Sequence, residues 1–191
     1  MSEQLEVNSH DEMLTRPRSA WETHSMGFNS GVYNVFLFLH VLAVIVGFGG
    51  VLLNGLYASR ARRYEPAQTL AVLEVNGFVS SRVAEWFILA AGILGFGLVS
   101  LSDGVFSWGQ TWVWLSILLY VVSLGVSHGL LLPRVRTMIA TQAGLVAGTA
   151  SADAPARMEA LGKQVGMFSG ALHLSFVVIL VLMIFKPGSG L

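Results

Sequence analysis

The sequence contains no cysteine, and this absence removes several classes of site at once. Disulfides, thiolate-bound metals, iron–sulfur clusters and covalently attached haem all require that residue. Charge is also scarce, since 12% of the residues are charged and the formal net charge is zero. A chain without a basic excess has no electrostatic footprint for nucleic acid, so we expect no nucleic-acid partner. Any cofactor would have to be held by His, Met, Glu, Asp, Tyr or backbone groups.

Hydrophobic residues are abundant instead, at 54% of the chain, and they gather in four long runs. A run of about 20 apolar residues is long enough to cross a hydrocarbon core of about 30 Å as a helix. The runs predict spans at about 32–58, 80–101, 111–132 and 165–185. We therefore expect an all-α integral membrane protein, an antiparallel four-helix bundle over residues 31–191 with the lipid bilayer as its surroundings.

Three polar stretches lie outside the predicted spans. Residues 1–30 form a polar tail without the basic start and apolar core of a signal peptide, and we expect it to be retained and mobile. Residues 65–78 and 156–164 are typical of short amphipathic helices at the membrane surface. The third span is expected to end before Pro133, because proline disrupts a helix interior.

The basic residues are distributed unevenly between the two ends of the predicted bundle. Of the eleven Lys and Arg, eight fall on the side that the chain reaches after the first span: Arg60, Arg62, Arg63, Arg82, Arg134, Arg136, Arg157 and Lys163. Basic residues concentrate on the cytoplasmic side of membrane proteins. This distribution predicts that the basic side is cytoplasmic and that both termini lie outside the cytoplasm.

One stripe of the first span carries small and polar residues at steps of seven: Tyr33, His40, Gly47 and Asn54. Such steps drift by only about 20° around a helix, so these residues share one face, which must point into protein. The stripe is either a packing surface with a hydrogen-bonded histidine or a face that holds a ligand.

Three ionisable residues from the other spans fall at a similar predicted depth. Counted from the basic end of each span, Glu85 and His128 lie about five residues in and His173 about eight, so at about 1.5 Å per residue their heights agree within about 5 Å. His40 lies in the opposite half of the bilayer, about 10 Å or more away by the same count.

These residues are compatible with three kinds of chemistry. His128 and His173 could ligate a haem b iron or another metalloporphyrin, and the trio Glu85, His128 and His173 could bind a metal ion such as Zn²⁺ or Fe²⁺. The same groups could pass protons. The simplest alternative is structural, with buried histidines bonded to backbone carbonyls and to each other, and Glu85 paired with Arg82 or another arginine at a helix start.

Several short motifs resemble those of a family of bacterial predicted integral membrane proteins of unknown function. They are LHVL at 39–42, GFGG at 47–50, ASRARR at 58–63, LPRVR at 132–136 and MIFKP at 183–187. That family is similar in layout to the copper-resistance D type membrane proteins and to the HemJ-type protoporphyrinogen oxidases, which are associated with haem. This resemblance implies His40 as an alternative haem ligand.

The leading hypothesis from the sequence is therefore a membrane protein that binds haem b in redox chemistry or haem handling. Two alternatives remain open. One is a non-catalytic accessory subunit of a larger respiratory or transport complex, which would have membrane-protein partners or form a homo-oligomer. The other is a small transporter with a His/Glu metal or proton site.

Overall fold

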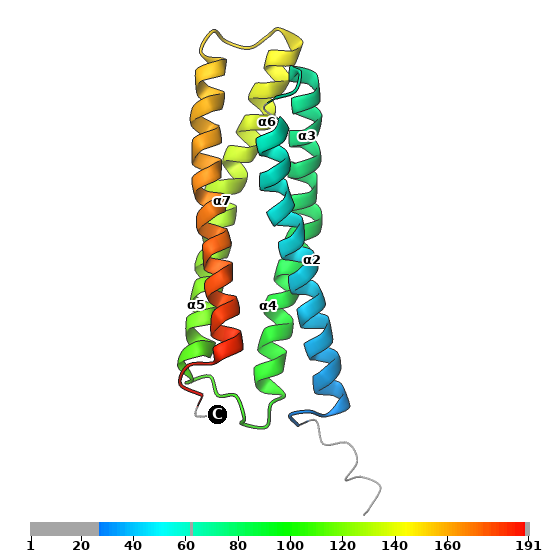
Figure 1. The fold of residues 1–191 in the computed structure, drawn as a ribbon, viewed down its shortest axis with the longest axis vertical. Helices are drawn as coiled ribbons and strands as arrows, with labels where there is room; N and C mark the ends of the chain where they lie inside the picture. The colour runs from blue at the N-terminus through cyan, green and yellow to red at the C-terminus, as the bar shows by residue number, and fades with distance from the viewer. Residues whose placement is uncertain (1–26, 62, 190–191) are drawn as a thin grey trace, which may run out of the picture.

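The computed structural model describes residues 27–61 and 63–189, and within these ranges it contains helices and their connections without any strand. Four long helical rods run side by side along the molecule (Figure 1). The first rod is α2 (Gly31–Ala61), and the second consists of α3 (Pro66–Phe78), η2 (Val79–Ala84) and α4 (Glu85–Ser100). The third consists of α5 (Thr111–Val126), η3 (Ser127–Leu131) and α6 (Leu132–Ala147), and the fourth is α7 (Ala154–Phe185). All four rods are long and apolar enough to cross a membrane, which confirms the predicted helical membrane bundle.

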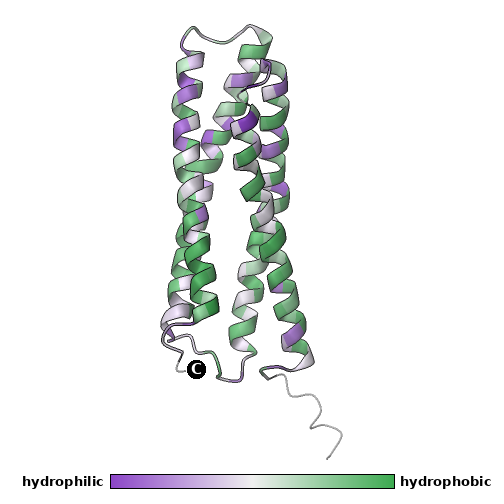
Figure 2. Ribbon diagram, in the orientation of Figure 1, coloured by the Kyte–Doolittle hydropathy of each residue, from purple (hydrophilic) through white to green (hydrophobic). Residues whose placement is uncertain are grey.

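The rods are longer than the predicted spans. The second, Pro66–Ser100, has 35 residues and so measures about 52 Å, against about 30 Å for a hydrocarbon core. The expected surface helices are continuous with the spans, because residues 65–78 become α3 and 156–164 become the first part of α7. Most of the polar residues gather in the upper half of the rods (Figure 2). We call this end, which carries Arg60, Arg82, Arg134, Arg136, Arg157 and Lys163, the basic end.

Pro133 does not end the third rod, contrary to the expectation from the sequence. Proline lacks the N–H that would bond to the carbonyl four residues earlier, and the helix absorbs this by widening into the π-helical segment η3 just before it. Arg134 Nη1 then donates to the Leu130 carbonyl at 2.7 Å, which satisfies a backbone oxygen near the proline. The rod therefore continues to Ala147 and ends at Gly148, whose positive φ of 69° suits a glycine.

The bundle consists of two close pairs at the end opposite the basic end, α2 with α4 and α5 with α7 (Figure 1). A buried cluster lies beside the 101–110 connection at this end, formed by Tyr33, Leu98, Phe106, Trp112, Val113 and Leu182. At the basic end, α3 packs on α6 and α6 on α7. The basic end is thus held together by different helix pairs from those of the opposite end.

The predicted stripe on α2 faces α4. Tyr33 and His40 are buried, and Gly47 lies so close to α4 that a Cβ there would be 3.0 Å from Ile88 Cγ1 and 3.2 Å from the Ile88 backbone nitrogen. Small residues allow helix backbones to approach in this way. The packed face is therefore confirmed for these three residues, while the side chain of Asn54 lies outside the described part of the structure.

We expect Gly47→Leu to destabilise the bundle, because the new side chain would have to displace the backbone of α4. Overpacking in tight interiors costs about 1–3 kcal/mol of unfolding free energy. The matched control is Gly49→Leu two residues on, since a Cβ at Gly49 has no atom within 4 Å outside its own helix turn. Thermal melts in detergent should show a lower Tm for Gly47→Leu alone, and equal melts would contradict the packing of α2 on α4.

Candidate functional site

Glu85 and His128 form a short side-chain hydrogen bond between the second and third rods. Glu85 begins α4 and His128 lies in η3, and Glu85 Oε1 is 2.7 Å from His128 Nε2. The side chains are 27% and 46% exposed respectively, so the pair lies at the edge of the bundle rather than in its centre. The partner of Glu85 is therefore a residue 43 positions away, and not the neighbouring Arg82 considered from the sequence.

The geometry of this pair requires an additional proton. His128 Nδ1 lies 3.0 Å from the Leu124 carbonyl, and because a carbonyl can only accept, Nδ1 must carry a hydrogen. A neutral imidazole carries only one, which would leave the Nε2 lone pair facing a carboxylate oxygen. Two acceptors cannot form so short a contact, so a proton resides on Nε2 or on Glu85. In either form the pair binds one proton with no net charge.

The backbone is unusual on both sides of the pair. The π-helical segment η2 ends immediately before Glu85, and η3 contains His128. A π-helical turn is wider than an α-helical turn, and such turns occur often at functional sites. Two of them at one height, in different rods, place the pair where both helices depart from regular geometry.

His173 lies at the same height on α7. Phe176, three residues past His173, stacks on Phe48 of α2. The neighbouring Gly47 packs on α4, since a Cβ there would lie 3.3 Å from Phe87 Cβ. Phe87 is two residues past Glu85, so His173 and Glu85 differ in height by about one helical turn at most. His173 Nδ1 donates to the Ser169 carbonyl at 2.6 Å, so Nε2 is left as the lone pair. Within the described structure Nε2 is buried and has no hydrogen-bond partner.

His40 is far from this group and has a different environment. Its ring is 8% exposed, Nδ1 donates to the Ala91 carbonyl at 2.8 Å, and a Cβ on Gly95 would lie 3.3 Å from His40 Cε1. Ala91 is six residues past Glu85, or about 9 Å along the helix, close to the separation expected from the sequence. His40 joins α2 to α4.

Each of these three histidines donates from Nδ1 to a backbone carbonyl, which is the bond that the structural alternative expected. Of the expected trio, Glu85 and His128 are in contact and His173 is level with them. Over residues 27–61 and 63–189, no three His, Asp or Glu side chains form a group that could hold a metal ion.

A line of buried polar groups on α5 was missed in the sequence. Ser116 and Ser123 have buried hydroxyls without a partner in the described chain, and between them Tyr120 donates from its hydroxyl to the Ile88 carbonyl at 3.2 Å. Their spacing of four and three residues places them on one helix face. This spacing was visible in the sequence, but serine and tyrosine are less conspicuous in a span than histidine. We call Ser116, Tyr120 and Ser123 the polar line.

The polar line continues from the pair toward the opposite end. Ser116 is twelve residues from His128, or about 18 Å along the helix, which is more than half of a core of about 30 Å. Buried hydroxyls without a protein partner commonly bind ordered water. The line therefore provides groups that can exchange hydrogen bonds with water inside the bundle.

A four-rod apolar bundle with ionisable side chains inside it defines an integral membrane protein. A comparison with protein families agrees, because the family model described as "Predicted integral membrane protein (DUF2269)" matches residues 34–187. The chain belongs to this family, whose function is unknown. No curated protein and no solved structure matches this chain.

Proposed function

We propose that this protein binds a proton at the Glu85–His128 pair and passes it through the membrane. The observation that carries the proposal is the 2.7 Å contact between Glu85 and His128, which needs a proton because His128 Nδ1 is already a donor to Leu124. Ionisable residues inside membrane spans are costly and often mark proton relays. Histidine suits this role because it titrates near neutral pH.

The proposed route runs from the basic end to the pair and on along the polar line. In this route the buried lone pair of His173 Nε2 accepts the proton at the height of the pair, and Ser123, Tyr120 and Ser116 continue the route toward the opposite end. Water bound between these groups would complete the hydrogen-bonded chain. We place the protein in the bacterial inner membrane with the basic end in the cytoplasm, on the distribution of Lys and Arg.

Binding of haem b is the second candidate function, and His173 favours it. Histidines that ligate metals usually donate their other ring nitrogen to a carbonyl or carboxylate, which fixes the tautomer. His173 meets this condition through Ser169, and its Nε2 is buried and without a partner. His128 fits less well, because both of its nitrogens have partners.

Glu85→Gln tests the proton-binding proposal directly. The amide is nearly isosteric and can donate an N–H to His128 Nε2, but it cannot exchange a proton with water near neutral pH. Because His128 could still bind a proton beside the amide, the titration adds His128→Gln: from alkaline to mildly acidic pH the detergent-solubilised double variant should bind about one proton fewer than the wild type. Infrared difference spectra of Glu85→Gln alone should lose the carboxyl band of Glu85. Equal proton uptake by the wild type and the double variant would reject the pair as a proton site.

A further inference from the structure

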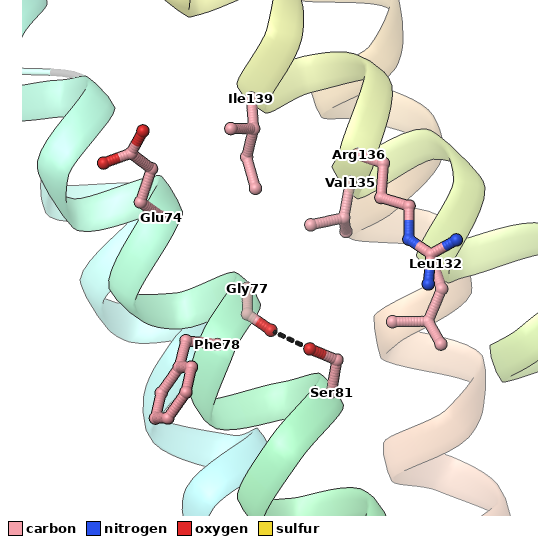
Figure 3. Close-up of a pocket in the computed structure, with 8 residues that line it drawn as sticks. All are labelled: Glu74, Gly77, Phe78, Ser81, Leu132, Val135, Arg136 and Ile139. Carbon is pink, nitrogen blue, oxygen red and sulfur yellow. Dashed lines mark hydrogen bonds between the residues drawn. The ribbon is translucent and has the colours of Figure 1, made fainter.

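A cleft of about 200 Å³ lies between α3 and α6 (Figure 3). In this view Glu74 and Ile139 stand at one end, while Ser81 and Leu132 stand at the other. The remaining lining residues are Gly77, Phe78, Val135 and Arg136. The walls approach closely at Gly77, where a Cβ would lie 2.9 Å from Ile139 Cδ1.

The inner end of the cleft lies one helical turn from the Glu85–His128 pair on both rods. Ser81 is four residues before Glu85, and Leu132 is four residues after His128, which is about 6 Å in each case. The segments between them are η2 and η3. The cleft and the pair therefore lie at successive heights along the same interface between the second and third rods.

The cleft also lies at the depth of the membrane–water interface on the basic side. Arg82 stands one residue past Ser81, and long basic side chains of membrane helices extend to the headgroup layer. A space of about 200 Å³ holds about six or seven waters at about 30 Å³ each. Ser81 Oγ donates to the Gly77 carbonyl at 2.7 Å, so its lone pairs can still accept hydrogen bonds from water.

Few charged groups surround this region. Glu74 and Arg136 line the cleft, and Arg134 is turned to α7, where it donates to Gln164 at 2.6 Å and covers the Phe168 ring. Arg82 flanks the pair on its own helix, and α7 adds His173. The described part of α2 contributes no acid or base between His40 and Arg60 except the phenol of Tyr57. Among the described residues, Glu74 is thus the one carboxylate that lines the cleft.

We propose that this cleft is a water-filled vestibule through which the Glu85–His128 pair exchanges protons with the basic side of the membrane. The inference rests on the proposed proton function of the pair and adds the route of access. Glu74 collects protons at the outer end, water in the cleft carries them past Ser81, and Glu85 or His128 receives them.

The absence of native cysteine makes thiol labelling a direct test, since each introduced cysteine is the only one in the chain. Ser81→Cys is placed at the inner end of the vestibule, and the matched control is Val83→Cys, which is two residues on, exposed, and outside the cleft lining. A charged, membrane-impermeant methanethiosulfonate should react with Ser81→Cys at least about tenfold faster than with Val83→Cys, a difference of about 1.4 kcal/mol in barrier height. Reaction should occur from the basic side of oriented membranes, which also determines the orientation.

Leu132→Cys, on the opposite wall, repeats the measurement if Ser81→Cys does not fold. Ile139→Trp added to either cysteine variant should fill the cleft and slow the reaction. Equal rates at Ser81→Cys and Val83→Cys, or no effect of Ile139→Trp, would overturn the vestibule and indicate a space filled by lipid. The labelling does not depend on proton transfer, so a labelled vestibule beside a pair that binds no proton would reject the proposed function and the exchange route but leave the water-filled cleft in place.

Discussion

Proteoliposomes that contain the Glu85→Gln variant should conduct protons at least about tenfold more slowly than wild-type proteoliposomes, a loss of about 1.4 kcal/mol in barrier height. The reason is that the amide preserves the contact with His128 Nε2 but removes the group that alternately holds and releases the proton. The measurement is the decay of an imposed pH gradient, followed with a trapped pH-sensitive dye. Because only a proton moves, no oxidant, reductant or co-substrate is needed, and K⁺ with valinomycin in all liposomes balances the charge that the proton carries.

Glu159→Gln is the matched control for this experiment. Glu159 also forms an ion pair, with Lys163 at 2.8 Å, but both side chains are more than two-thirds exposed at the start of α7. The same substitution there removes a carboxylate without touching the second or third rod. If Glu85→Gln conducted protons as fast as the wild type, or if Glu159→Gln slowed conduction equally, the pair would not be on the route.

His173→Ala should remove haem completely if the purified protein contains haem b. The structure sharpens the expectation from the sequence, which had both His128 and His173 as ligands, because of these two only His173 has a buried nitrogen without a partner in the described chain. We expect His128→Ala to retain the cofactor, since both of its ring nitrogens have partners. His40→Ala should retain it because His40 bonds to Ala91, about 9 Å along the helix from the level of Glu85 and His173. The Soret band and the pyridine haemochromogen measure the content of each variant.

The opposite pattern would be equally informative. Loss of haem only in His40→Ala would support the ligand implied by the resemblance to HemJ-type proteins and reject His173. A colourless wild-type protein, produced with ample haem, would reject the haem hypothesis and leave the proton proposal to its own tests. Other membrane chains that purify with a colourless protein would favour the accessory-subunit alternative.

The sequence by itself determined the class of protein and the depth of its ionisable groups. Both follow from the length and position of the apolar runs, because about 20 apolar residues cross a hydrocarbon core as a helix and isolated charges are costly inside it. The packed stripe of α2 was predictable for the same reason, since seven-residue steps keep Tyr33, His40 and Gly47 on one face. Counting residues also placed Glu85, His128 and His173 at one level.

Only the tertiary structure decided which of these groups are in contact. Periodicity gives the height of a residue and the face of its own helix, but not the rotation of neighbouring helices about their axes or which helices are neighbours. Glu85 meets His128 where η2 and η3 lie at the same height in the two rods, and His173 Nε2 remains without a partner in the described chain. The continuation of the third rod past Pro133 was equally hidden, because a missing N–H can either end a helix or be absorbed by a π-helical turn. Which of the two occurs depends on packing against the other rods, here α3 and α7 against α6, and that packing is a property of the folded chain.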